Sequence, residues 1–413
     1  MSKKLILQLI LLVSVLFLMV HGIYCQNKES ITQRVADEVA EKRPYSDDSP
    51  WNLKIGPKPV YDPNSDMYIT QLHGLFGANP NMYAKPVYEV SQSTPRKSVM
   101  VSRWYSNVIN NGTKLIRQRE VTVTIPIPDK AVPAQGRDAH IIFWDPKTGD
   151  EWGFWQAEPQ LDGTWVVRNG YHYNTNWKGV PPVGFLSRGA GLPYLAGLIR
   201  PWELGQGRIE HAIAVAVKHP NRFHIYPATR SDGKGLPPDL PLGARLHLDP
   251  SLTEKDFQGW GLSREGQVIA KALQEYGMIL TDGGGHPKIS IEYEGTAHWG
   301  KLLNNDIVKH IPYSAFKVLS LDTPEKPIPP ENLRLECKEG KVLLAWQPSP
   351  TATRYRIKRV LLDHGSSEIL ADWVTSSYYV DTSVQKKAEY EYLIFAINHN
   401  GISEPSKAAL LEH

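Results

Sequence analysis

Short runs in which apolar and polar residues alternate recur along the chain, and turn-forming residues separate them. Examples are GKVLLAWQPS (340–349), RYRIKRV (354–360) and RFHIYPA (222–228). Alternation places successive side chains on opposite faces of a strand, and the chain has 32 glycines and 32 prolines to supply turns. The pattern therefore predicts an all-β fold.

Two segments depart from simple alternation. In SREGQVIAKALQEYGM (263–278) the apolar residues recur at helical spacing, Ser263 can cap the start and Gly277 can end the helix. RIEHAIAVAV (208–217) alternates but is apolar on both faces. Such a run is typical of a central strand that is covered on both sides, with a glutamate and a histidine as its polar side chains.

The amino-terminal residues predict export. Lys3 and Lys4 precede an apolar run over residues 5–20, which has the length of a signal-peptide core and is short for a membrane span. We expect a signal peptide over 1–25, then a charged linker over 26–50. The protein is expected to be secreted, extracellular or periplasmic, with no membrane span.

The net charge and the cysteine content exclude some binding partners and some kinds of site from what we expect of this chain. The formal charge is +3 and falls to +1 without Lys3 and Lys4, so nucleic acid and anionic membranes are not expected partners. Cys25 and Cys337 are the two cysteines, too few for a disulfide framework or a cysteine metal site. We expect no cofactor, no metal and a monomer.

The chain changes character after a proline-rich segment over 322–330, which predicts an extended hinge. The matches that follow are, in order, the Pro-Pro start at 329–330, Trp346, Tyr355 and the ending YEYLIFAINHNG. This region resembles a fibronectin type III domain. The resemblance implies a seven-strand sandwich over 331–413, in which Tyr390 makes a tyrosine-corner hydrogen bond, and a spacer or docking role without catalysis.

Five phrases between residues 138 and 286 form a second pattern. They are DAHIIFWDPKTGDEWGFWQA, AGLPYLAGLIRPWELGQGRIEHAIAVAV, YPATRSDG, LPLGARLHLDP and QEYGMILTDGGGH. Together they resemble a widespread, uncharacterised family of secreted bacterial proteins, which implies one recurring domain and no transferable catalytic residues. The fold we predict is a large jelly-roll-like β-sandwich with one or two helices over 51–321, followed by the fibronectin type III sandwich.

Five of the twelve tryptophans fall within residues 144–177, close to acids and histidines. They either fill a core or include one or two that line a groove on which sugar rings stack. NGYHYNTNW (169–177) packs a histidine and three asparagines among aromatics, which a core does not need, and so favours a groove. The candidate substrate-binding residues here are His140, Trp155, His172 and Tyr173.

The acids supply candidates for catalysis. Hydrolysis of a polysaccharide needs two carboxylates across the glycosidic bond, whereas β-elimination needs a base and a group that neutralises a uronic acid. A carboxylate and an imidazole on an otherwise apolar strand would have perturbed proton affinities. The alternative is a buried hydrogen-bonded pair that only holds the sheet together. The candidate catalytic residues are Glu203, Glu210, His211, Asp138 and Asp282.

Two loops supply the remaining candidates. YPATRSDG (226–233) carries a tyrosine, an arginine and an acid out of a strand, either as a surface ion pair or as groups that act on a uronic acid together with His211. TDGGGH (281–286) is either a flexible turn or a loop that closes on a ligand. The candidate substrate-binding residues are Tyr226, Arg230, Asp232 and His286.

These observations predict a carbohydrate-active protein that cleaves a polysaccharide or cell-surface glycan by hydrolysis or β-elimination. The alternative is a non-catalytic glycan-binding or surface-attachment protein. Geometry separates the two: an enzyme requires a carboxylate and a histidine beside Trp or Tyr in a cleft, and it loses support where the acids point into a dry core.

Overall fold

The computed structural model describes residues 43–321, 327–338, 340–349, 352, 354–363, 365–385, 388–398 and 401–411. The predicted signal peptide, most of the linker and part of the hinge lie outside the described residues. Within those ranges, none of the helices combines the length and the apolar character that a membrane crossing requires.

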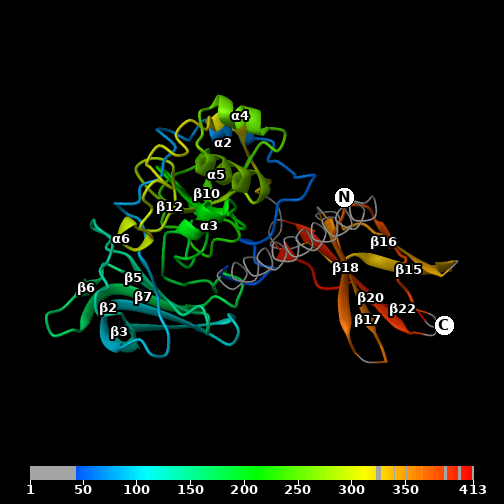
Figure 1. Ribbon diagram of the computed structural model, residues 1–413, viewed down its shortest axis with the longest axis horizontal. Helices are drawn as coiled ribbons and strands as arrows, with labels where there is room; N and C mark the ends of the chain where they lie inside the picture. Colours follow the sequence, from blue (N-terminus) through cyan, green and yellow to red (C-terminus); the bar gives the residue numbers. More distant parts are fainter. Residues whose placement is uncertain are drawn as a thin grey trace, which may run out of the picture. The chain divides into compact units, whose positions relative to one another are not determined.

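The first sheet of the large domain has seven strands, in the order β1-β4-β5-β7-β2-β3 with β6 paired to β7 (Figure 1). Both faces are buried: one packs around Val99 and Phe143, the other around Trp144 and Tyr171. The predicted hairpin is present as β4 and β5. The strands are β1 (Val87–Glu89), β2 (Arg96–Ile109), β3 (Lys114–Pro126), β4 (Ile141–Trp144), β5 (Asp150–Trp155), β6 (Glu158–Pro159) and β7 (Trp165–Asn174).

The second sheet has five strands in the order β13-β8-β12-β11-β14, and a small pair, β9 and β10, accompanies it. β8 and β12 run parallel, so their carboxyl ends lie at the same edge of the sheet. The strands are β8 (Ile213–Val217), β9 (Asn221–His224), β10 (Pro241–Leu242), β11 (Arg245–Leu248), β12 (Met278–Gly283), β13 (Lys288–Ile289) and β14 (Phe316–Val318).

The predicted helix is confirmed as α5 (Arg264–Glu275). Ser263 Oγ accepts a hydrogen bond from the amide of Gly266 at 3.2 Å, and Gly277 has the left-handed φ of 72° that ends a helix. The apolar face of α5, including Ile269 and Leu273, is buried in the main core. The other helices are α2 (Ser65–Ile69), α3 (Pro201–Gln206), α4 (Glu254–Gly259), α6 (Glu294–Ala297) and the 3-10 helix η1 (Tyr313–Ala315).

The predicted all-β class is confirmed, because strands dominate and the helices are short. Within the large domain the details differ from a jelly roll. There are more helices than the one or two predicted, and four of the described strand pairs are parallel. Strand β8 begins at Ile213 rather than at 208, so Glu210 and His211 precede it. Trp144 and Trp165 are core residues.

The large domain also begins earlier than residue 51. Tyr45 is buried, and its hydroxyl donates to Glu151 at 2.9 Å. Ser49 is buried too, with its hydroxyl donating to the carbonyl of Lys178 at 2.7 Å. Residues 45–49, which were predicted as linker, are therefore part of the packed domain.

Residues 331–411 form a fibronectin-type-III-like sandwich of two sheets, β15-β16-β19 and β18-β17-β20-β21, with β22 paired to β20. Trp346, Tyr355 and Tyr390 lie in its core. The strands are β15 (Glu331–Lys338), β16 (Lys341–Gln347), β17 (Arg354–Leu361), β18 (Ser367–Val374), β19 (Tyr378–Asp381), β20 (Tyr390–Asn398), β21 (Gly401–Ile402) and β22 (Ala409–Leu411). In Figure 1 they take the orange and red colours.

The predicted tyrosine corner is present and predicts a measurable stability change. The Tyr390 hydroxyl oxygen accepts a hydrogen bond from the amide of Gln385 at 3.2 Å. Tyr390→Phe should lower the free energy of unfolding of the sandwich by about 1 kcal/mol, because one buried hydrogen bond is lost. Urea unfolding measures the change, and Tyr378→Phe, at an exposed tyrosine of the same domain, should leave it unaltered. Equal stability of the two variants would contradict the corner.

Candidate functional site

A cavity of about 490 Å³ lies where strands β8 and β12 end. Ala216, near the end of β8, and Asp282, near the end of β12, both line it. In sheets with parallel strands, ligands bind outside the carboxyl ends of the strands, and ligand pockets usually hold about 300–1,000 Å³. This space, the first cavity, is therefore the candidate functional site.

Four predicted site residues line the first cavity together. Asp138 and His140 reach it from the segment before β4, whereas Asp282 and His286 come from the end of β12 and the loop after it. Tyr83 lines the same cavity. Carboxylates and histidines thus meet beside an aromatic ring, which is the arrangement that an enzyme requires.

Backbone amides hold the carboxylate of Asp282. Its Oδ1 accepts hydrogen bonds from the amide of Gly189 at 3.3 Å and from the amide of Gly283 at 3.1 Å. Burial raises the pKa of Asp282; Lys85 opposes the shift and Asp232 adds to it. Asp282 therefore keeps its proton to a higher pH than an ordinary aspartate, as a general acid must.

A second cavity, of about 280 Å³, adjoins the first and brings another carboxylate to Asp282. Asp282, Gly283 and Gly284 line both cavities, and Asp232 lines the second. Gly189 lies against both carboxylates, because a Cβ at this position would be 2.4 Å from Asp232 Oδ1 and 3.0 Å from Asp282 Oδ1. The two carboxylates thus share the space at the boundary between the cavities.

Lys85 lines the first cavity and was not among the predicted residues. It is 7% exposed. Its Nζ lies 5.9 Å from the centre of the Tyr194 ring, and no described residue forms a hydrogen bond or ion pair with it. Burial lowers the pKa of Lys85 to about 7, with Arg188 acting in the same direction. An amine with that pKa can accept a proton near neutral pH.

His140 packs against the same tyrosine as Lys85. The rings of His140 and Tyr194 meet edge to face with their centres 4.9 Å apart. Burial, together with the charges of Lys85 and Arg188, holds the pKa of His140 well below its usual range, so the ring is neutral. Its buried Nδ1 has no hydrogen-bond partner among the residues that the structure describes, and a ligand hydroxyl would supply one.

Two aromatic side chains border the charged groups. Trp155 donates its Nε1–H to Asp138 Oδ1 at 3.0 Å, and Lys288 Nζ lies 5.4 Å from the centre of the Tyr83 ring. Tyr83 and Ala139 have left-handed φ values of 57° and 39°, which are uncommon for residues other than glycine. Backbone strain of this kind concentrates at functional sites, and it coincides here with the cavity.

Glu203 and His211 form a buried pair that is absent from the described linings of the two cavities. His211 Nε2 lies 2.9 Å from Glu203 Oε1, and Nδ1 donates to the carbonyl of Ala212 at 2.9 Å. Glu203 Oε2 accepts from the amide of Arg200 at 2.7 Å and so caps α3. Both side chains are buried, and their contacts join α3 to the start of β8. This is the structural alternative considered for the pair.

The other acid of that group, Glu210, is also absent from the described linings of the two cavities. Its carboxylate pairs with Arg208 at 3.1 Å, and about a third of its side chain is exposed. An ion pair of this kind at the surface contributes little to stability. Because Glu210 lies before β8 begins, it does not face the strand's apolar neighbours as predicted.

The structural role of Glu203 predicts a variant that is destabilised but active. Glu203→Gln should lower the free energy of unfolding by about 2 kcal/mol, because hydrogen bonds to a charged group are weakened. The catalytic assignment predicts instead a loss of polysaccharide cleavage per folded molecule, which the structural role does not. Urea unfolding and initial rates measure the two effects, and Asp306→Asn, at a mostly exposed acid, is the control. A loss of rate with unchanged stability would restore the catalytic assignment.

His172 and Tyr173 do not line a groove. Tyr173 is buried in the main core. The His172 ring lies between Asn107 Oδ1 at 3.0 Å and Asp150 Oδ1 at 2.8 Å, and it stacks on Trp152 with the ring centres 5.2 Å apart. The hydrogen bonds of His172 and the core packing of Tyr173 hold both side chains away from the described cavities, so the structure gives no support to a sugar-binding groove at 171–173.

Tyr226 and Arg230 are not among the described residues that line the two cavities. Arg230 Nη1 donates to the carbonyl of Arg188 at 3.3 Å, and its amide donates to the carbonyl of Ala190 at 3.3 Å. These contacts of Arg230 hold the loop that carries Asp232 in place. They give no support to the predicted substrate contacts of Tyr226 and Arg230.

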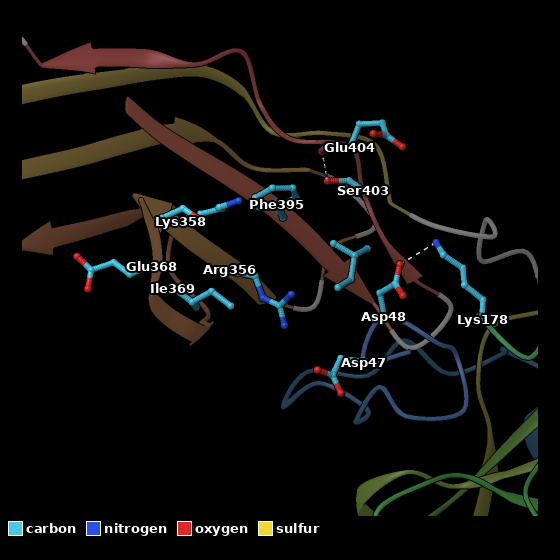
Figure 2. Close-up of a pocket in the computed structure, with 12 residues that line it drawn as sticks. Asp47, Asp48, Lys178, Arg356, Lys358, Glu368, Ile369, Phe395, Ser403 and Glu404 are labelled. Atoms are coloured by element: carbon cyan, nitrogen blue, oxygen red, sulfur yellow. Dashed lines mark hydrogen bonds and ion pairs between the residues drawn. The ribbon is translucent and has the colours of Figure 1, made fainter. Parts of the chain in front are cut away.

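Another pocket of the described residues lies away from these two cavities. It holds about 730 Å³, and Figure 2 shows the twelve residues that line it, among them Asp47 and Arg356. Asp48 pairs there with Lys178 at 2.9 Å. None of the predicted site residues belongs to this lining. In the described ranges, no three His, Cys, Asp or Glu side chains gather as a metal-binding group.

The known proteins to which this chain is similar match only part of it. No family model matches the chain, so the family resemblance over 138–286 stays a prediction. Part of the chain is similar to an amylopullulanase of Thermoanaerobacterium thermosulfurigenes, with 34% identity over 112 residues. The match covers 25% of this chain and only 6% of the length of that protein.

Among solved structures, the chain is similar to a Fn3-like protein from Clostridium thermocellum, with 28% identity, coverage of 21% of this chain and 98% of the other, and a TM-score of 0.19. It is also similar to a FN3 domain of human collagen XX, with 20% identity, coverage of 21% and 91%, and a TM-score of 0.20. Because these TM-scores are low, the sandwich assignment rests on the strand order given above.

Proposed function

We propose that this protein is a carbohydrate-active enzyme that hydrolyses a polysaccharide, with Asp282 and Asp232 as its catalytic pair. The observation that carries the proposal is the meeting of the two carboxylates at Gly189, on the boundary between two adjoining cavities. Glycoside hydrolysis needs two such groups on either side of the scissile bond, one protonated and one ionised.

The environments of the two acids suit different roles. Asp282, whose pKa burial raises, donates its proton to the glycosidic oxygen as the bond from that oxygen to the anomeric carbon breaks. Asp232 is exposed, and both Oδ1 atoms lie within 3.0 Å of the Cβ position at Gly189, which is the close spacing of a retaining pair. The Asp232 oxygen therefore bonds to the anomeric carbon as the glycosidic oxygen leaves. Water then displaces Asp232 from that carbon and gives a proton back to Asp282, which restores both carboxyl groups. Each proton is accounted for, and no other reactant is needed.

The surroundings of the pair support a sugar ligand. Tyr83 presents an exposed ring at the first cavity, where a sugar face can stack. The unpartnered His140 Nδ1 can bond to a hydroxyl. The similarity to part of an amylopullulanase, a glycoside hydrolase, is consistent with a carbohydrate-associated protein, although it covers a quarter of this chain.

A second mechanism is favoured by a specific observation, the unpaired amine of Lys85. With a pKa of about 7, Lys85 can take the proton next to a uronic acid carboxylate, while Lys288 neutralises that carboxylate. The electrons left on carbon then form the carbon–carbon double bond as the glycosidic oxygen leaves with the proton of Asp282, which lines the same cavity. This β-elimination would use the first cavity alone.

One experiment separates these chemistries from binding alone. The full chain is incubated with neutral and uronic acid polysaccharides, while reducing ends and the ultraviolet absorbance of unsaturated products are followed together. Hydrolysis predicts reducing ends without absorbance, and β-elimination predicts both. Retention on a polymer that yields no product would overturn the enzyme proposal and leave a glycan-binding protein.

A further inference from the structure

We infer that the substrate is an anionic polysaccharide carrying uronic acid groups, which runs across both cavities and is cut within the chain. The inference rests on the proposed function for the place of cleavage. It adds the substrate class and the position of the cut, which follow from three features of the two cavities.

The first feature is that Asp282 lies between the cavities rather than at the end of one. Asp282, Gly283 and Gly284 contribute to both linings. A cavity on each side of the catalytic carboxylate offers binding space for sugar residues on both sides of the broken bond. An enzyme with space on both sides of the bond can cut at internal positions.

The second feature is the set of basic side chains in both cavities. Lys85 and Lys288 line the first cavity beside Asp138 and Asp282, and Lys218 and Lys234 line the second beside Asp232 and Asp282. With Asp282 protonated, the lysines outnumber the carboxylates in each cavity. Lys218 and Lys234 are exposed, and no ion pair joins either of them to a described residue. Cations on both sides of the cut attract a polymer with repeating negative charge, whereas a neutral polymer would not use them.

The third feature is the run Gly283-Gly284-Gly285 at the boundary. None of the three has a left-handed φ. A Cβ at Gly283 or Gly284 would come no nearer than 3.6 and 3.4 Å to its neighbours, and at Gly285 it would meet nothing within 4 Å. The fold therefore does not demand glycine here. Missing side chains instead let a polymer lie close to the backbone as it passes from one cavity to the other.

Binding of oligogalacturonates of increasing length to the full chain tests the inference, with neutral oligosaccharides of matched length for comparison. Calorimetry on the Asp282→Asn background prevents cleavage during the measurement. We expect Lys218→Ala/Lys234→Ala to weaken binding of long oligogalacturonates about tenfold. Short ones that fit the first cavity should bind as before. Lys130→Ala/Lys147→Ala removes the same charge at exposed sites and should bind normally.

A second variant separates folding from binding. Gly285→Leu should keep the thermal stability of the parent, because the added side chain enters open space, and should weaken binding of the long oligomers only. Unchanged binding in both variants, or stronger binding of the neutral oligomers, would overturn the inference. Oligogalacturonates that bind as expected but are never cleaved would overturn the proposed hydrolysis and leave the substrate class standing.

Discussion

Asp282→Asn should lower the rate of polysaccharide cleavage by about 10²–10⁴-fold, the usual contribution of a general acid. The amide keeps the shape of the carboxyl group, and its oxygen can still accept from the amides of Gly189 and Gly283. It has no acidic proton to deliver to the leaving oxygen. Reducing ends released under saturating polymer measure the effect, with Asp129→Asn, at an acid whose side chain is 78% exposed, as the matched control.

The pH profile gives an independent test of the same role. The general acid must be protonated, so the rate should fall as pH rises through the raised pKa of Asp282. Lys85 opposes this raised pKa, and Lys85→Met should therefore move the alkaline fall to higher pH. A profile that the Lys85 variant leaves unmoved, or a fully active Asp282→Asn, would show that Asp282 is not the acid.

Lys85→Met should stabilise the protein by about 5 kcal/mol below neutral pH, because it removes the cost of burying an ammonium. The pKa of Lys85 falls from 10.5 to about 7 on folding. Between those values the unfolded chain binds more protons than the folded one, so the stability of the natural protein rises with pH. The natural protein therefore has a lower free energy of unfolding than the variant. This difference is largest below about pH 7 and disappears above about pH 10.5.

Urea unfolding of the Lys85 variant at several pH values measures this difference. Lys58→Met, at an exposed lysine, should show no comparable gain. A stabilisation that is the same at every pH would mean that packing, and not proton binding, explains it. A destabilised variant would mean that the ammonium is paired in solution. Active sites commonly contain residues that lower the stability of the fold because the reaction needs them.

Local patterns account for the parts of the fold that could be predicted. The helical spacing and the Ser263 cap depend on neighbours in sequence, and both are present in α5. The corner of Tyr390 likewise depends on a short motif and a turn. Parallel pairing of β8 with β12 joins segments that are far apart in the chain. Alternation alone gives no information on such pairing.

The candidate site was predictable only in part, for the same reason. Asp138 and His140 stand just before an aromatic hairpin, Asp232 stands in a polar loop and Asp282 stands near the end of β12, so residue type marked them. Glu203 and His211 were correctly seen as unusual, but a sequence does not show whether a buried pair faces a cavity or a core.

Lys85 carried no local signal. It is a single lysine in MYAKPVY (82–88), with no partner or period nearby. Its burial arises from a distant segment: its amide donates to the carbonyl of Ile291 at 3.4 Å, and the amide of Tyr293 donates to its carbonyl at 3.1 Å. An alternation of small and aromatic residues around a lone lysine is too common to mark a site.

The central claim is that Asp232 and Asp282 act as one catalytic pair. The most direct test compares cleavage by Asp232→Asn, Asp282→Asn and the double variant on a polymer that the natural protein cuts. Groups that act as a unit are strongly non-additive, so each single variant should lose nearly as much rate as the double. Losses that multiply, or a single variant that keeps the natural rate, would contradict the account.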